Sequence, residues 1–378
     1  MRKFVIAMIA VFGVIALGLI ILMVSVIGSG GISVSSSYSI AGVELVNTSN
    51  ISMEGVSSLS LDYSSDDIYF FESDTQELIL KEYMNFSPDE DELTQIKQSG
   101  SELRLRSGRI RHNWFFNHYS GYVEVYLPAN YQGNISSITS SGNIVSDAAL
   151  NLSDFAASSS SGDIRFNEVT ASEVSASSTS GNIEFDIAVG NRSFSSSSGD
   201  IRIKGGNGDT TASSTSGNII ISKSAGKLTA DASSGNITIA GAIGDKEIET
   251  TSGEIELSGC IGYVKASASS GDIIISDQGG AGTFESTSGN IRISFTDELS
   301  TSKEDIEASA SSGNVELRLP SGLNFDFVAK TSSGDIDTSF DDSLSYKKDG
   351  DYASGTIGAN PDFSIEIGTS SGNITVED

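Results

Sequence analysis

The chain is poor in the residues that build disulfide, zinc and nucleophilic sites. Its 378 residues include one cysteine, two histidines and one tryptophan. A single cysteine excludes a framework of internal disulfides, and so few cysteines and histidines exclude the usual kind of zinc site. A serine triad would need a histidine among the serine-rich repeats described below, but both histidines precede them. We therefore expect no catalytic centre, no metal and no cofactor.

Positive charge is also scarce. The chain has 22 Lys and Arg against 50 Asp and Glu, which gives a net charge of −28. Nucleic acid selects basic protein faces, so we exclude it as a partner. An acidic surface attracts cations and cationic peptides, and it also keeps an exposed, serine-rich surface soluble.

One long hydrophobic run lies near the N-terminus. Arg2 and Lys3 precede residues 4–27, which carry no charge. As a helix these residues span about 36 Å, enough to cross a hydrocarbon core of about 30 Å. The next positive charge is Lys81, so the positive-inside rule places the short N-terminus in the cytoplasm and the remainder outside. A cleaved signal peptide is the alternative, although its apolar core is usually only about 7–15 residues long.

A short phrase, Ser-Gly-[Asn/Asp/Glu]-[Ile/Val], dominates the rest of the chain. It occurs twelve times, and six successive steps measure 18 residues each. Repeats of this period indicate a solenoid. The glycines of the phrase, which we expect at the turns of the repeat, are Gly142, Gly162, Gly181, Gly199, Gly217, Gly235, Gly253, Gly271, Gly289, Gly313, Gly334 and Gly372.

Apolar residues alternate on both sides of each repeat glycine. They stand two and four positions after it, as at Ile237 and Ile239, and seven, five and three positions before it, as at Leu228, Ala230 and Ala232. This period of two predicts two short half-buried strands in each coil. We expect the glycine to supply a positive φ at the turn between them. The Asn or Asp that follows should hydrogen-bond to turn backbone and stack from coil to coil at about 4.8 Å.

The segments before the repeats differ from them. Residues 1–28 are predicted as the cytoplasmic tip and transmembrane anchor, and the Gly- and Ser-rich residues 29–44 as a flexible tether. Residues 45–132 depart from the 18-residue period and are rich in aromatic residues, with 13 of the 29, so we predict an N-terminal β cap there. Residues 133–378 are predicted as the β-solenoid. The fold class is therefore all-β apart from one transmembrane helix.

These motifs together resemble a bacterial putative-adhesin family of unknown function. The resemblance rests on a strand pair near residues 59–71, strands that end in proline at 123–128 and 315–320, and the Ser-Gly-Asp/Asn-Ile phrases. It implies a membrane-anchored, cell-surface parallel β-helix made from a single chain, usually right-handed. It implies no catalytic residues. Because 18 residues also equal three hexapeptides, a left-handed coil stays an alternative.

One basic and aromatic cluster interrupts the acidic sequence. A loop of this composition suits binding to a glycan or a membrane surface, where Trp and Tyr are common. Alternatively, it forms a hairpin that packs over the open end of the solenoid. The candidate binding residues are Arg109, Arg111, His112, Trp114, Phe115, Phe116 and Tyr119.

Two further motifs have some features of known sites. Residues 205–209, Gly-Gly-Asn-Gly-Asp, resemble one calcium-binding nonapeptide of secreted β-rolls, but the aspartate stands one position early and the motif occurs once. Cys260 follows a predicted strand with no histidine near it in sequence. We expect neither a calcium site nor a reactive thiol here, and Cys260 is predicted to be packed or idle.

The features together favour a non-enzymatic protein of the cytoplasmic membrane, single-pass, with its N-terminus inside and its solenoid extracellular. Its repetitive surface suits adhesin-like binding to a cell-wall polymer, a glycan, a cationic peptide or an envelope protein. The resemblance also implies an alternative, an envelope-stress component that senses cationic peptides or cell-wall damage. A polysaccharide-acting enzyme is disfavoured because it would need carboxylates clustered on one sheet face. The outward residues are mixed: Arg165, Glu184, Arg202, Thr238, Glu256 and Arg292.

Overall fold

The computed structural model describes residues 42–110, 119–347 and 350–378. These residues are all-β, as predicted, and no helix among them is long and apolar enough to cross a membrane. The transmembrane helix expected at 1–28 and nearly all of the tether lie outside the described residues. The described helical segments are short 3₁₀ turns: η1 (Glu90–Glu92), η2 (Asp297–Thr301) and η3 (Asp341–Ser343).

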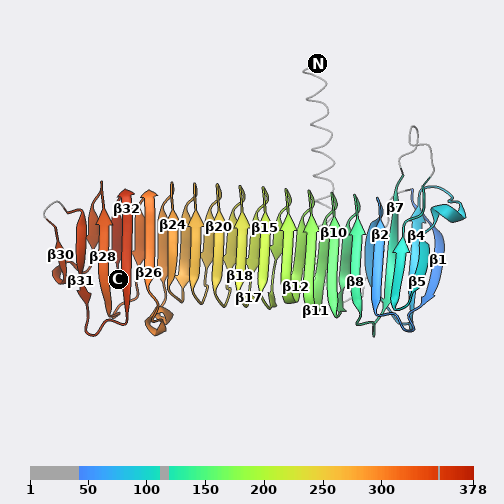
Figure 1. The fold of residues 1–378 in the computed structure, drawn as a ribbon, viewed down its shortest axis with the longest axis horizontal. Helices are drawn as coiled ribbons and strands as arrows, with labels where there is room; N and C mark the ends of the chain where they lie inside the picture. The colour runs from blue at the N-terminus through green and yellow to red at the C-terminus, as the bar shows by residue number, and fades with distance from the viewer. Residues whose placement is uncertain (1–41, 111–118, 348–349) are drawn as a thin grey trace, which may run out of the picture. The chain divides into compact units, whose positions relative to one another are not determined.

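Each coil contributes one strand before its repeat glycine and one after it, and equivalent strands pair in parallel from coil to coil (Figure 1). We call the first set the pre-glycine column. Its strands pair with equivalent repeat positions opposite each other, as Leu228 opposite Lys246. The central members are β8 (Asn134–Thr139), β10 (Asp154–Ser159), the second halves of β11 (Ile164–Ser178) and β12 (Ile183–Ser196), β15 (Thr210–Ser214), β18 (Leu228–Ala232), β20 (Lys246–Thr250), β22 (Val264–Ala268), β24 (Gly282–Ser286) and β26 (Ile306–Ser312).

The strands after each glycine form the post-glycine column. Their inward side chains stack as an isoleucine ladder that is fully buried, including Ile219, Ile237 and Ile255. A third, shorter ladder joins β14 (Gly206–Asn207) to β17 (Ser224–Ala225). The central members of the post-glycine column are β9 (Ile144–Asn151), the first halves of β11 and β12, β13 (Ile201–Ile203), β16 (Ile219–Ser222), β19 (Ile237–Ala240), β21 (Ile255–Ser258), β23 (Ile273–Gln278), β25 (Ile291–Phe295) and β27 (Val315–Arg318).

The coils at the N-terminal end do not follow sequence order. Strand β2 (Ser58–Tyr63) lies between β6 (Glu102–Arg106) and β8, and β3 (Asp67–Ser73) lies between β7 (Gly121–Pro128) and β9. In Figure 1 the blue strand β2 accordingly stands next to the green β8. Antiparallel strands then close this end. These are β1 (Glu44–Ser52) on β4 (Glu77–Met84), β4 on β7, and β5 (Gln95–Ser99) on β6.

The C-terminal end has the same kind of insertion. Strand β32 (Phe363–Ser371) lies between β26 and β28 (Phe325–Thr331), and β33 (Ile374–Glu377) lies between β27 and β29 (Ile336–Thr338) (Figure 1). The expectation that successive phrases stack in sequence order is therefore correct up to Gly313 and wrong for the last two, since the Gly372 coil precedes the Gly334 coil. Antiparallel β31 (Tyr352–Ile357) and β30 (Leu344–Tyr346) close this end.

The predicted reason for the repeat glycines is wrong. Of the twelve, only Gly334 has a positive φ, at 158° and close to extended backbone. At each of the twelve, a Cβ atom would instead lie closer than 3.0 Å to a backbone carbonyl oxygen of the neighbouring coil. At Gly217, for example, that oxygen belongs to Gly199. These positions therefore require glycine because adjacent turns approach too closely for any side chain.

A second glycine column supplies the positive φ. Five glycines, each nine residues after a repeat glycine, have φ between 110° and 121° and recur at 18-residue steps. They were not predicted as turn positions, although their spacing is as regular as that of the phrase. They are Gly190, Gly208, Gly226, Gly244 and Gly262.

Two buried cations contact this second glycine column. Arg192 and Lys246 occupy the position seven residues before a repeat glycine and are 3% and 2% exposed. The Arg192 guanidinium donates to the carbonyl of Gly208 at 2.6 Å, and the Lys246 Nζ donates to the carbonyl of Gly244 at 2.6 Å. Burial lowers the pKa of Arg192 to about 10 and also lowers that of Lys246. These cations therefore pair with backbone carbonyls inside the solenoid.

The predicted ladder of Asn and Asp side chains is present. The backbone N–H of Asn182 donates to Oδ1 of Asp163 at 2.7 Å, and the N–H of Asp200 donates to Oδ1 of Asn182 at 2.9 Å. Near the C-terminus the ladder follows the spatial order of the coils, because Asn373 donates to Asn314 and Asp335 donates to Asn373. Each side chain thus satisfies a turn amide of the next coil.

A hydroxyl three residues before the glycine links the same turns. Ser178 Oγ accepts the Gly181 N–H at 2.9 Å and donates to the Gly162 carbonyl at 3.3 Å. We expect Ser178→Ala to lower the free energy of unfolding by about 1 kcal/mol, as the loss of a buried hydrogen bond does. Since alanine occupies this position naturally at Ala232, the fold should persist.

The measurement is urea unfolding of the variant beside Ser177→Ala. The Ser177 hydroxyl is exposed and bonds only to the Ser158 hydroxyl among the described residues. Its removal should change stability by less than about 0.5 kcal/mol. Equal costs for the two variants would show that the Ser178 bonds do not stabilise the turn.

Candidate functional site

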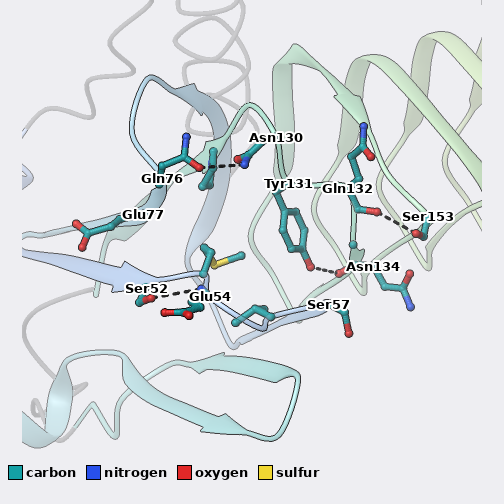
Figure 2. Close-up of a pocket in the computed structure, with 14 residues that line it drawn as sticks. Ser52, Glu54, Ser57, Gln76, Glu77, Asn130, Tyr131, Gln132, Asn134 and Ser153 are labelled. Atoms are coloured by element: carbon teal, nitrogen blue, oxygen red, sulfur yellow. Dashed lines mark hydrogen bonds between the residues drawn. The ribbon is translucent and has the colours of Figure 1, made fainter.

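A cleft with a volume of about 810 Å³ lies beside the start of β2 and the start of β8 (Figure 2). Four separate segments line it. They are the connection from β1 to β2 at residues 52–57, the start of β4 at Gln76 and Glu77, the connection from β7 to β8 at 128–134, and Ser153 just before β10. Polar side chains from distant parts of the sequence therefore converge at one place.

The insertion of β2 and β3 brings these segments together. The chain leaves the coil of β6 and β7 at the end of β7. It then passes the inserted coil of β2 and β3 before it starts β8. On the way, the N–H of Asn134 donates to the carbonyl of Ser57 at 2.9 Å. A Cβ atom at Gly133 would overlap that same carbonyl oxygen, so glycine allows the two connections to touch.

Hydrogen bonds hold the lining side chains in place. Asn130 Nδ2 donates to Gln76 Oε1 at 3.0 Å, and the Tyr131 hydroxyl donates to the Asn134 carbonyl at 2.9 Å (Figure 2). The Tyr131 ring is partly buried against the core, and burial raises the pKa of its hydroxyl to about 12. The Ser153 hydroxyl donates to the Gln132 carbonyl at 2.9 Å. The side chains of Gln76, Asn130, Tyr131 and Ser153 are thus fixed at the cleft.

The chemistry of the lining is that of binding. Two carboxylates, Glu54 and Glu77, stand among amides and hydroxyls, and no Lys, Arg, His or Cys is among the described residues that line the cleft. A nucleophile beside a base is therefore missing from this set. Elsewhere in the described ranges, no group of three His, Cys, Asp or Glu side chains is placed to hold a metal ion.

The basic and aromatic cluster predicted as a binding loop lies elsewhere. Only Arg109 and Tyr119 belong to the described residues, whereas Arg111, His112, Trp114, Phe115 and Phe116 lie outside them. Arg109 lines a separate cleft of about 480 Å³ with Asp62 and Arg106. Tyr119 donates its hydroxyl proton to Asp66 and packs edge-on against Phe86. The structure does not bring these two residues into the cleft of Figure 2, and the binding loop stays a prediction.

Cys260 is fully buried, as the packed thiol expected from the sequence. Its Sγ lies 3.6 Å from the Ser258 carbonyl oxygen.

The buried carboxyl of Asp66 makes stability depend on pH. Burial raises its pKa to about 6, the bond from Tyr119 opposes this, and the charges of Glu82 and Asp67 add to the increase. Because the folded pKa exceeds the ordinary 3.8, the folded state binds the proton more tightly. The resulting stability is full below about pH 4 and is lost as the pH rises through about 6, by about 3 kcal/mol in total.

Unfolding free energies at pH 4.5 and pH 7 should reveal this loss in the natural chain. Asp66→Asn should abolish it and be the more stable protein at pH 7, since the amide keeps an acceptor for Tyr119 and carries no charge. Asp62→Asn removes an exposed carboxylate paired with Arg106 and serves as the control. If both variants retain the loss between pH 4.5 and pH 7, Asp66 is not its source.

Comparison with known proteins identifies a family. The model of the family described as Toastrack DUF4097 matches residues 56–242 and 242–377. This match confirms the resemblance to a family of putative adhesins of unknown function. No curated protein matches the chain.

Solved structures that match over most of their length share little sequence with the chain. A putative cell adhesion protein from Clostridium sporogenes is 9% identical, with 88% of this chain and 97% of that one covered and a TM-score of 0.19. A putative adhesin from Bacteroides fragilis is 12% identical, with 87% and 96% covered and a TM-score of 0.21. A putative lipid binding protein from Parabacteroides distasonis is 14% identical, with 88% and 96% covered and a TM-score of 0.29.

Proposed function

Because the chain belongs to the Toastrack DUF4097 family, we propose that it is a non-enzymatic binding protein of the bacterial cell envelope that attaches to envelope material. The observation that supports this is the cleft of Figure 2, in which hydrogen-bonding side chains from four segments converge without an adjacent nucleophile and base. The solenoid holds this cleft on a stack of coils whose polar groups are paired from turn to turn. Such a scaffold suits a fixed binding site.

The location is part of the proposal. The uncharged run at 4–27, preceded by Arg2 and Lys3, would anchor the chain in the cytoplasmic membrane with the coils outside, and the coil would be right-handed. In intact cells that produce the full chain with a C-terminal tag, added protease should remove the tag. Protection of the tag until the cells are lysed would contradict this orientation.

Binding can be tested with the full chain in detergent micelles and envelope material isolated from the source organism. We expect retention on that material, and at least a tenfold loss of affinity in the double variant Asn130→Ala, Gln132→Ala. Both side chains are exposed, so the fold should be unaffected. The matched control is Gln98→Ala with Asn191→Ala, two exposed amides outside the cleft. Equal retention of both double variants would contradict binding through the cleft.

The net charge of −28 favours a second candidate, the recognition of cationic peptides by an envelope-stress component. Such binding would weaken steeply as salt is added, because exposed charges are screened. The test is the binding of a lysine decamer. Tight binding that weakens with salt and is the same in the cleft variant as in the natural chain would favour recognition of cationic peptides over attachment to envelope material.

A further inference from the structure

We infer that the ligand of the cleft of Figure 2 is an uncharged glycan chain, an inference that rests on the proposed function. The volume of about 810 Å³ lies within the range of about 300–1,000 Å³ typical of sites for small ligands. A short stretch of a polysaccharide fits this space better than a folded protein surface does. The chemistry of the lining decides between the kinds of ligand.

The charges in the cleft disfavour acidic ligands. Glu54 and Glu77 contribute two negative charges, and no described lining residue is basic. A phosphate, a sulfate or a uronic acid would meet these carboxylates without a cation to pair with. Polymers that carry such groups are therefore disfavoured.

The amides point to hydroxyl groups as the ligand's polar atoms. Gln76, Asn130, Gln132 and Asn134 each offer a carbonyl acceptor and an NH₂ donor. A sugar hydroxyl is both donor and acceptor. One hydroxyl can therefore donate to an amide carbonyl or a carboxylate, while a neighbouring hydroxyl accepts from an amide NH₂. A polycation uses acceptors alone and would leave the amide donors unpaired, which costs binding energy.

Tyr131 provides the apolar surface that a sugar ring needs. Its ring packs against the core, and its hydroxyl is fixed on the Asn134 carbonyl at 2.9 Å. Figure 2 shows Asn130 and Gln132 on either side of it. The C–H face of a pyranose can lie on such a ring while its hydroxyls reach the flanking amides. Fixing the ring in advance lowers the entropy cost of binding.

The hydrogen bond between Asn130 and Gln76 adds to this preorganisation. One NH of Asn130 pairs with the Gln76 carbonyl at 3.0 Å. Among the described residues, the side-chain carbonyl of Asn130 and the NH₂ of Gln76 make no hydrogen bond, so both stay available to the hydroxyl groups of a ligand.

The test separates the polysaccharide of the source organism's envelope by anion exchange into an uncharged and an anionic pool. The full chain in detergent micelles is titrated with each pool and with a lysine decamer. We expect the uncharged pool to bind, and the Asn130→Ala, Gln132→Ala variant to bind it at least tenfold more weakly. Tyr131→Phe, which keeps the ring, should bind within about threefold of the natural chain, and Tyr131→Ala should lose binding.

The outcomes separate this inference from the proposed function. If only the anionic pool or the lysine decamer binds, or if neither pool binds, the glycan inference is wrong. The proposed function still holds in those cases if the cleft variant loses retention on whole envelope material. If the cleft variant is retained on whole envelope material as well as the control double variant is, both the glycan inference and the proposed function are wrong. Circular dichroism of each variant confirms that loss of binding is not loss of fold.

Discussion

Replacing Gly217 by alanine is expected to lower the free energy of unfolding by at least about 3 kcal/mol, at the upper end of overpacking effects. A Cβ atom there would lie closer than 3.0 Å to the carbonyl oxygen and carbon of Gly199 and to the backbone nitrogen of Asp200. All three are backbone atoms, so no side-chain rotation relieves the overlap. Both turns are also held by hydrogen bonds to their neighbours, including the bond from Asn218 N–H to Asp200 at 2.8 Å.

The measurement is the urea midpoint of the full chain, and two variants make it specific. Gly368 lies in β32 without a positive φ, and a Cβ atom added there would meet nothing within 4 Å, so Gly368→Ala should change stability by less than about 1 kcal/mol. Gly217→Asn separates the two explanations of the glycine. Asparagine tolerates a left-handed turn, whereas a close backbone approach rejects it as firmly as alanine. An asparagine variant as stable as the natural chain would contradict the close approach.

The coils themselves could be predicted from the sequence because the alternation reports burial directly. Ile237 and Ile239 are buried, and in equivalent coils the residue between the two buried ones is half-buried or exposed. The Asn and Asp ladder also followed, since a polar residue fixed after each turn stacks on its equivalents. The cause of the glycine was misjudged because a glycine in a sequence does not distinguish a positive φ from a close contact.

The order of the end coils could not be predicted. Ile374 and Val376 fit beside Val315 and Leu317 as well as the equivalent residues of the Gly334 coil would, because every coil presents the same inward pattern. The inward pattern therefore predicts that the coils stack, but it does not determine the order in which they stack. The cleft was missed for the same reason. Its walls at 52–57 and 128–134 meet only because the β2 and β3 coil is inserted between others.

Removing the buried amino group of Lys246 should have the second large effect. Lys246→Ala is expected to cost about 3 kcal/mol, from the cavity it leaves and from two backbone carbonyls that lose the Nζ donor, although the Ile261 carbonyl keeps the Gly244 N–H at 3.0 Å. Those carbonyls belong to Gly244 and Ile261, at 2.6 and 2.8 Å from Nζ. Lys265→Ala, which removes an exposed lysine paired with Glu247, should cost less than about 1 kcal/mol.

Lys246→Leu separates the volume of the side chain from its charge. Leu228 and Val264 occupy the same inward position in the two adjacent coils, so a branched apolar side chain fits there. Leucine also lacks the Nζ donor, but it fills the cavity and needs no desolvation of a charge, and well-packed apolar replacements of buried ions are often neutral or stabilising. We expect the leucine variant to unfold within about 1 kcal/mol of the natural chain.

Raising the pH provides an independent check on the same residue. Burial lowers the pKa of Lys246 below the ordinary 10.5, so the folded state disfavours the charged form. The free-energy cost of burying the charged amino group is fully present below the folded pKa. It is relieved as the pH rises through that pKa toward 10.5, so the natural chain gains stability across that window. Lys246→Leu should lack this gain. If its unfolding free energy rises between pH 8 and pH 10 as much as that of the natural chain, the gain arises from other groups and the amino group of Lys246 does not carry the assigned cost.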